Sequence, residues 1–435
     1  MQWILLSVIY YGLYGVNALD YSNYPAIQRF QEYIQINTTT GANLTPAVEF
    51  WTQLAEEQGV PINVYEYGEG YPIVVLKWAG QDSSLNSIQL NSHMDVVPAD
   101  ENEGWSYPPF GGVLAEDGNI YGRGTQDMKS VSIQYYEALS GIKANNITLL
   151  RDVYMTLMPD EEVGGEDGMI PFLQSDEFSA MNVGLELDEG TSYPIPIIPL
   201  FYQDKVVWQI KVDCHGVAAH GSTFPATNTT ATGKCRNVID TLLKFRDEQY
   251  IISTSASIFD AGVYTSVNLN RLNGGTANNI IPSLVSLTFD IRLGTRVNED
   301  AFQAQLEQWI AEAGDNIMLT YISKNPQSPA TLVSSSNPYW IAIAEAAQTL
   351  RIPIVPIVPP GSTDARHVRL AGVPAFGISP MANTPMLLHA VDEYIPAETF
   401  LRGIDIYEQI ITNLANIPGS ETSTDPSVYI VKTAL

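Results

Sequence analysis

Short apolar runs alternate with helical stretches along most of this chain, and this alternation limits the possible folds more than any other feature. Four runs read as buried strands, at 73–76, 88–90, 153–157 and 183–187. Helices are expected around and between them, at 26–36, 46–58, 128–143 and 338–350. Strands that alternate with helices predict an α/β sheet covered by helices on both faces.

The pattern changes in the middle of the chain. Residues 206–212 alternate between apolar and polar side chains, as a half-exposed strand does. The elements that follow complete the order βαββαβ, with expected bounds of 232–249, 266–272, 284–291, 300–312 and 317–322. This order is a self-contained, ferredoxin-like two-layer unit. We therefore expect one domain at 19–198 and 326–435, with a second domain at 199–325 inserted into it.

The overall charge narrows the range of partners. The chain has 435 residues, enough for a full core, and its 45% hydrophobic and 16% charged residues are typical of a soluble globular protein. Its net charge is −27. Phosphate contacts need a basic surface, so nucleic acid is not an expected partner. The acidity favours solubility, with a preference for uncharged or cationic ligands as the alternative reading.

Residues 1–18 differ from the rest of the chain. An apolar stretch is followed by small residues that end at Ala18. This resembles a secretory signal peptide cleaved after Ala18, although no Lys or Arg precedes the apolar run. A membrane anchor is the alternative, but a span needs roughly 20 apolar residues, and no segment of the chain provides them. We therefore expect a secreted or luminal glycoprotein, with sequons at Asn37, Asn43, Asn146 and Asn228.

The chain has two cysteines, Cys214 and Cys235. In an oxidising compartment they could pair, and the alternative is two buried thiols. Two cysteines without a CxxC motif cannot supply a zinc–thiolate cluster.

Histidine and acidic residues gather at five points, most of them directly after an apolar strand. The groups are His93-Met94-Asp95, Asp127, Asp160-Glu161-Glu162, Asp188-Glu189 and His389. Taken singly, each group has an ordinary explanation. His93 could form a hydrogen bond at the surface, for example, and Asp127 could be a helix N-cap. The carboxyl ends of the strands, however, form the edge of an α/β sheet at which sites are built. Their common position therefore favours one shared site.

The residue types at these points indicate a metal centre. Histidine and carboxylate ligands without cysteine suit catalytic zinc or a related divalent ion. Two histidines with at least three carboxylates exceed the needs of one tetrahedral ion. Such a set fits two ions about 3.5–4 Å apart that share one bridging carboxylate.

Together the motifs resemble those of the dizinc aminoacylase/carboxypeptidase family of amidohydrolases, and of its animal aminoacylases in particular. The resemblance rests on SHMDVVP (92–98), YGRGTQDMKS (121–130), MPDEEVGG (158–165), LDEG (187–190) and LLHAVDE (387–393), in this order. It implies a zinc-exopeptidase-like α/β catalytic domain with an inserted ferredoxin-like dimerisation or lid domain. It also implies a homodimer with two Zn²⁺ per subunit.

Carried onto this sequence, the resemblance implies a role for each member of the site. His93 would bind one zinc ion with Asp95 orienting it, Asp127 would bridge the two ions ahead of a cis peptide to Met128, Glu161 would be the general base, and Glu162 and His389 would hold the second ion. In the fourth motif Glu189 is the preferred ligand, with Asp188 as the alternative.

The resemblance also implies substrate contacts. His220 would polarise the scissile carbonyl from across a dimer, Asn279 and Arg292 would hold a substrate carboxylate, and Thr363 and Arg369 would lie in another substrate-contacting loop. His215 and His367 have no implied role and are expected to be surface histidines.

The expected activity is hydrolysis of N-acyl-L-amino acids to a carboxylate and a free L-amino acid, by a metal-activated water with a glutamate base. A secreted dizinc dipeptidase or carboxypeptidase is the alternative with the same chemistry. A non-catalytic binding protein on the same fold is a remote alternative, because it predicts a missing ligand or base and none is missing.

Overall fold

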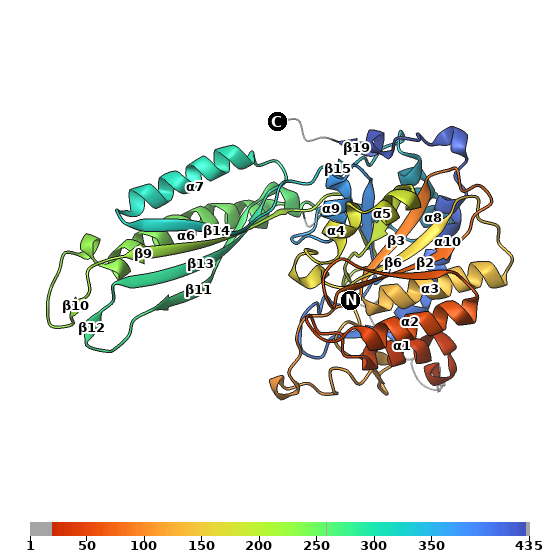
Figure 1. Ribbon diagram of the computed structural model, residues 1–435, viewed down its shortest axis with the longest axis horizontal. Helices are drawn as coiled ribbons and strands as arrows, with labels where there is room; N and C mark the ends of the chain where they lie inside the picture. Colours follow the sequence, from red (N-terminus) through yellow and green to blue (C-terminus); the bar gives the residue numbers. More distant parts are fainter. Residues whose placement is uncertain (1–19, 258, 432–435) are drawn as a thin grey trace, which may run out of the picture.

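A computed structural model describes residues 20–257 and 259–431, which form two lobes (Figure 1). The expected signal peptide, 1–18, lies outside the described residues. Among the helices that are described, none combines the length and apolar character needed to cross a membrane.

The larger lobe is built on an eight-stranded mixed sheet in the order β1-β2-β6-β3-β7-β17-β8-β16. The strands are β1 (Ile62–Glu66), β2 (Pro72–Trp78), β3 (Ser87–His93), β6 (Val153–Met158), β7 (Val183–Asp188), β8 (Ile198–Phe201), β16 (Ile354–Ile357) and β17 (Ala375–Ile378). At its centre β6, β3, β7 and β17 run parallel to one another, whereas β2 and β8 on either side are antiparallel to this group. Their carboxyl ends therefore meet at one edge.

Helices cover both faces of this sheet, so the expected α/β class is confirmed. One face packs against α1 (Pro25–Gln35), α2 (Thr45–Gln58), α3 (Lys129–Ala144), α8 (Pro338–Leu350) and α10 (Ala397–Ala415). The other face packs against the shorter α4 (Met169–Leu173), α5 (Asp176–Met181) and α9 (Ala365–Leu370). Gly59 ends α2 in the left-handed conformation, at φ 59°, which glycine adopts without a side-chain clash.

The inserted domain has the expected βαββαβ order. It comprises β9 (Val206–His215), α6 (Ala231–Ser255), β11 (Ser266–Gly274), β13 (Leu284–Leu293), α7 (Glu299–Ala313) and β14 (Ile317–Lys324). The strands form an antiparallel sheet in the order β11-β13-β9-β14, and the two helices pack together over it. At the end far from the larger lobe, β10 (Ala219–His220) pairs with β12 (Ile280–Ile281) (Figure 1).

The expected domain boundary at 199 needs correction. Residue 199 falls inside β8, whose four residues are buried and pair with β16 and β17 of the large sheet. The inserted domain therefore begins after β8, at the start of β9. The remaining short strands are β4 (Val113–Leu114), β5 (Asn119–Tyr121), β15 (Ala330–Thr331), β18 (Tyr394–Pro396) and β19 (Ile430–Val431).

Cys214 on β9 and Cys235 on α6 both belong to the core of the inserted domain, where they are free, buried thiols. The structure thus agrees with two buried thiols rather than with a disulfide.

Candidate metal centre

The acidic and histidine residues converge at the carboxyl edge of the central strands. His93 is the last residue of β3, the Glu161-Glu162 pair follows β6, and Glu189 follows β7. Because β6, β3 and β7 are parallel neighbours, these three groups are brought to one point of the sheet. His389 joins them from the loop before β18.

Asp127 lies between the two histidines. Its Oδ1 is 3.1 Å from His93 Nε2, and its Oδ2 is 3.2 Å from His389 Nε2. The N-cap of α3 is Met128, and the Asp127–Met128 peptide bond is cis. Asp127 is therefore not the capping residue, and it presents one oxygen to each half of the centre, as a bridging carboxylate does.

Each half of the centre has its own second carboxylate. Glu189 Oε2 lies 3.7 Å from His93 Nε2, and Glu162 Oε2 lies 3.1 Å from His389 Nε2. Within the described residues, Glu162 Oε1 is buried and has no hydrogen-bond partner. Two sets of nitrogen and oxygen donors that share Asp127 fit a pair of divalent cations.

The carboxylates gathered at the centre favour binding of a cation. Burial raises the pKa of both Glu162 and Glu189, and the negative charge of Asp127 raises both further. Burial also opposes ionisation of Asp127, but hydrogen bonds with His389 and His93 hold its pKa well below the usual range. Because crowded carboxylates repel one another, divalent ions would neutralise the charge that the protein gathers here.

Glu161 faces the same space without pairing directly with a histidine. Ligand atoms of His93, Glu161 and Glu189 lie within 4.8 Å of one another. Burial raises the pKa of Glu161 well above its usual range, and the nearby Asp364 raises it further, while His93 and Arg366 act in the opposite direction. A buried carboxylate with a raised pKa is suited to take up a proton.

Asp95 acts differently from expectation. His93 Nδ1 is 2.8 Å from the backbone oxygen of Asp95 but 3.6 Å from its carboxylate. That carboxylate instead accepts the backbone N–H groups of Glu161, at 3.1 Å, and Glu162, at 3.3 Å. Asp95 therefore orients the ring through its main chain and fixes the glutamate pair through its side chain.

The geometry distinguishes the two acids of the fourth motif. Asp188 uses its carboxylate elsewhere, accepting Asn91 Nδ2 at 3.1 Å and the Ala365 N–H at 2.8 Å. Glu189 is the member of the pair that faces His93. Glu189, the ligand preferred from the sequence, is therefore the acid of this motif that lies toward the centre.

Glu393 is a positioning residue that sequence reasoning missed. Its carboxylate accepts Arg123 Nη1 at 2.8 Å and the backbone N–H of Gln126 at 2.7 Å. Arg123 Nη2 also donates to the backbone oxygen of His389. This network ties the loop before Asp127 to the loop of His389. Glu393 is the last residue of the LLHAVDE motif, and this position could have indicated its role.

A cavity of about 750 Å³ lies beside the centre, between the two domains. One side is lined by the inserted domain and its connection, through Val207, Gln209, Arg292, Ser323 and Asn325. The other side is lined by Thr363 and Arg366. The carboxylates that line it are those of Asp127, Glu161, Glu162 and Glu189, all of the metal centre. The charged residues that line the cavity are therefore those of the metal centre together with Arg292 and Arg366.

Two expected substrate residues lie away from this cavity. His220 and Asn279 are neighbours at the far tip of the inserted domain, where the Gly221 N–H donates to the Asn279 oxygen at 2.7 Å. His220 is exposed, and its Nδ1 contacts Ser222 Oγ. Within one chain, neither residue is brought to the metal centre.

Arg369 is placed differently from expectation. Its side chain is fully buried, pairs with Asp204 and donates to the backbone oxygen of Ala375. It does not line the cavity, so its expected role in substrate contact is wrong. Arg366, three residues earlier on α9, lines the cavity instead, and its Nη1 lies 3.9 Å from Glu161 Oε1.

His215 is exposed, as expected, but His367 is not a surface histidine. His367 is partly buried and donates its Nε2–H to the Gly164 oxygen, at 3.2 Å. Burial lowers the pKa of His367 to about 3, and the positive charge of Arg366 contributes. The ring is therefore neutral and holds the loop that follows Glu162.

We expect Arg366→Gln and Arg369→Gln to affect different properties. Because Arg366 lines the cavity, its change to Gln should lower kcat/KM about 10–100-fold, the loss expected for one charge-assisted hydrogen bond. Arg369→Gln leaves Asp204 buried and unpaired, which should destabilise the fold by about 3–5 kcal/mol. Steady-state kinetics and urea unfolding measure the two effects. A stable Arg369 variant with a raised KM would contradict this assignment.

Sequence comparison shows similarity to a family model and to curated proteins. The family model described as peptidase family M20/M25/M40 matches residues 89–413. The human protein named Aminoacylase-1 is 39% identical over 396 residues, covering 91% of this chain and 96% of that protein.

Solved structures share the fold. An M20 family metallo-carboxypeptidase from Sulfolobus solfataricus superimposes with a TM-score of 0.73 at 16% identity, covering 91% of this chain and 100% of that chain. A dinuclear metal-binding peptidase of the M20 family from Bacillus subtilis does so with a TM-score of 0.64 at 14% identity, covering 89% and 96%.

Proposed function

The chain belongs to peptidase family M20/M25/M40, and on that premise we propose that it is a zinc-dependent amidohydrolase that cleaves N-acyl-L-amino acids. Relatives of which it covers nearly the whole length are named aminoacylase. The substrate would lie in the interdomain cavity with its amide beside Glu161. The products are a carboxylic acid and a free L-amino acid.

The lining of the cavity carries this proposal. Arg292 and Arg366 line the cavity and would bind the carboxylate of an amino acid, although Arg292 also pairs with Asp290 through its Nε at 2.8 Å and its Nη2 at 3.1 Å. A dipeptide would also bring a free ammonium group, which needs an acidic partner. Of the lining carboxylates, Asp127, Glu162 and Glu189 would bind the cations, and Glu161 would serve as the base, so none is assigned to an ammonium group. The cavity therefore suits a blocked amine better than a free one.

An uncharged side cavity supports the same substrate class. It measures about 320 Å³ and shares Thr191, Phe201, Pro360 and Met386 with the catalytic cavity. Its other walls include Tyr264, Ile357 and Val358, and none of its lining residues is charged. An apolar group next to the scissile amide would be taken out of water there.

The residues of the centre divide the catalytic work. His93 and Glu189 would hold one zinc ion, His389 and Glu162 the other, and Asp127 both. The ions, when bound, would supply Lewis acidity for the water and for the substrate carbonyl. Glu161 would take the proton of the attacking water and later pass it to the leaving amine. The Asp95 carboxylate holds Glu161 in place by accepting the Glu161 backbone N–H.

We further propose that the enzyme is a homodimer in which His220 and Asn279 complete the active site of the partner. Both residues lie on the exposed tip of the inserted domain. Apolar side chains are exposed around them, with Phe224 fully exposed and Val217 67% exposed. A contact between tips or across subunits would cover these side chains.

Secretion and glycosylation are also proposals. The four sequon asparagines, Asn37, Asn43, Asn146 and Asn228, all have exposed side chains, which a glycosyltransferase requires. N-terminal sequencing of protein from the culture medium, with a glycosidase-dependent mass shift, tests both. A mature chain that begins at Met1 would contradict cleavage after Ala18.

Metal removal tests the proposed chemistry. We expect dialysis against a chelator to abolish hydrolysis of N-acetyl-L-methionine, and about two equivalents of Zn²⁺ per chain to restore it. Metal analysis and steady-state rates measure the two steps. Full activity in metal-free protein would overturn the proposal.

A further inference from the structure

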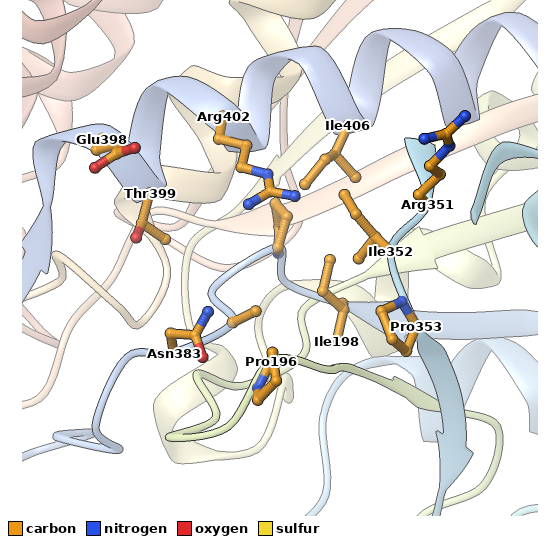
Figure 2. A pocket seen from close by; sticks show the side chains of 12 residues that line it. Pro196, Ile198, Arg351, Ile352, Pro353, Asn383, Glu398, Thr399, Arg402 and Ile406 are labelled. Carbon is orange, nitrogen blue, oxygen red and sulfur yellow. The ribbon is translucent and has the colours of Figure 1, made fainter. Parts of the chain in front are cut away.

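A second hollow lies on the larger lobe, away from the metal centre. It measures about 310 Å³, within the range of small-molecule sites, roughly 300–1,000 Å³ (Figure 2). Residues of α10, the start of β8 and the segment before β16 line it, and it shares none of them with the catalytic cavity. It is therefore a separate space.

Two arginines at this hollow are without a protein acceptor. Neither the Arg351 nor the Arg402 side chain forms an ion pair or hydrogen bond within the part of the chain that the structure describes. This is unexpected in a chain with 48 acidic and 21 basic residues. Figure 2 shows the Arg402 guanidinium extending over the hollow, and Arg351 at the opposite rim with its guanidinium directed away from the isoleucines. Both groups are exposed and available to an anion.

The walls below the arginines are apolar. Figure 2 shows Ile198, Ile352 and Ile406 close together in the hollow. Pro196, Pro353 and Pro380 also line it. This surface would accept a short aliphatic body, which gains roughly 0.8 kcal/mol for each buried methylene group. The site thus combines an apolar floor with a cationic rim.

One acidic residue also lines the hollow. Glu398 lies one helical turn before Arg402, yet the two form no ion pair. Figure 2 shows the Glu398 carboxylate at the edge of the hollow, turned away from Arg402. Two cations against one anion leave a net positive rim, which favours a ligand with one negative charge.

The hollow lies behind the loops that carry two residues of the metal centre. Its lining residues Ala382 and Asn383 belong to the segment that leads to His389, and Pro196 to the segment that follows Glu189. The Asn383 N–H donates to the Ile195 oxygen at 3.1 Å, so the two segments are tied together. A molecule bound here would therefore rest against both loops.

We propose that this hollow is a binding site for small aliphatic carboxylates. The carboxylate would pair with Arg402, assisted by Arg351, and the aliphatic body would pack on the three isoleucines. Asn383 is within the same lining and offers an amide donor. The proposal concerns binding at a second site and does not depend on the substrate class proposed above.

Methyl NMR of the zinc-loaded, full-length protein tests this proposal. With the isoleucine δ1 methyls labelled, titration with 4-methylpentanoate should shift the signals of Ile198, Ile352 and Ile406 saturably. Ile210, in the core of the inserted domain, is the internal reference. The neutral isostere 4-methylpentanamide should leave the three signals unchanged. Equal shifts with acid and amide, or no shift with the acid, would overturn the proposal.

Variants test whether the charge of Arg402 binds the carboxylate. Arg402→Gln should weaken 4-methylpentanoate binding about tenfold, the loss expected for one charge-assisted contact. Arg236→Gln removes the same charge from an exposed site on α6, where its side chain is 71% exposed, and should leave binding unchanged. L-Leucine carries the same body with an added ammonium group and should bind more weakly. Tighter binding of leucine would mean that Glu398 reads an amine, and would refute a site for simple carboxylates.

Discussion

Glu161→Gln should retain both metal ions and lose about 10²–10⁴-fold in kcat, the usual contribution of a general base. Glutamine keeps the shape of the side chain but cannot take up the proton of the attacking water. The hydrogen bonds from the Glu161 and Glu162 backbone to Asp95 do not involve the substituted side chain. The loop, and with it Glu162, should therefore remain in place. Metal analysis together with steady-state kinetics measures the result.

Glu162→Gln is the matched comparison. Glu162 contacts His389 at 3.1 Å and would hold the second ion, so this change should lower metal content as well as activity. Loss of metal in the Glu161 variant, with retention in the Glu162 variant, would show that the two roles are exchanged.

His220→Ala should lower activity about 10²–10³-fold, the usual effect of removing one donor that stabilises an oxyanion. The exposed position of His220 predicts that folding and metal content stay normal. Because His220 lies at the tip of the inserted domain, we attribute this loss to the partner's active site. Mixing experiments can separate that role from one within the same chain.

A heterodimer of the His220→Ala and Glu161→Gln variants should contain one intact site. That site would combine Glu161 of one subunit with His220 of the other. Random exchange of equal amounts makes half of the dimers mixed, so about a quarter of the wild-type activity should return. Each variant alone, refolded in the same way, is the control. Mixtures that stay as inactive as the separate variants would contradict the cross-subunit role.

The sequence predicts the central strands and the inserted domain well, and the outer strands poorly. β6 and β7 are largely apolar, and β3 carries the apolar pair Ile88 and Leu90, which is enough to indicate three buried strands. β8 and β16 each contain a proline within four residues, so their sequences read as connections rather than strands. The misplaced boundary at 199 follows from this, because only tertiary pairing reveals that β8 belongs to the large sheet.

The sequence predicts the site residues that lie at strand ends. It does not predict those whose position depends on how a helix is rotated or on a second chain. Arg366 and Arg369 both lie on α9, and only the packing of that short helix decides which one meets the cavity. The carboxylate of Asp95 likewise binds the loop after β6, a partner that strand alternation does not identify. The place of His220 depends on an assembly that one sequence does not describe.

The central claim is that the cavity is built for a blocked amino acid. The most direct measurement compares kcat/KM for N-acetyl-L-methionine with that for L-alanyl-L-methionine on zinc-loaded protein. These substrates share the leaving amino acid and differ at the acyl side, where the dipeptide carries a free ammonium group. Because the cavity has no lining carboxylate outside the metal centre, leaving that charge unpaired should favour the N-acetyl substrate at least about tenfold. Faster cleavage of the dipeptide would contradict the account.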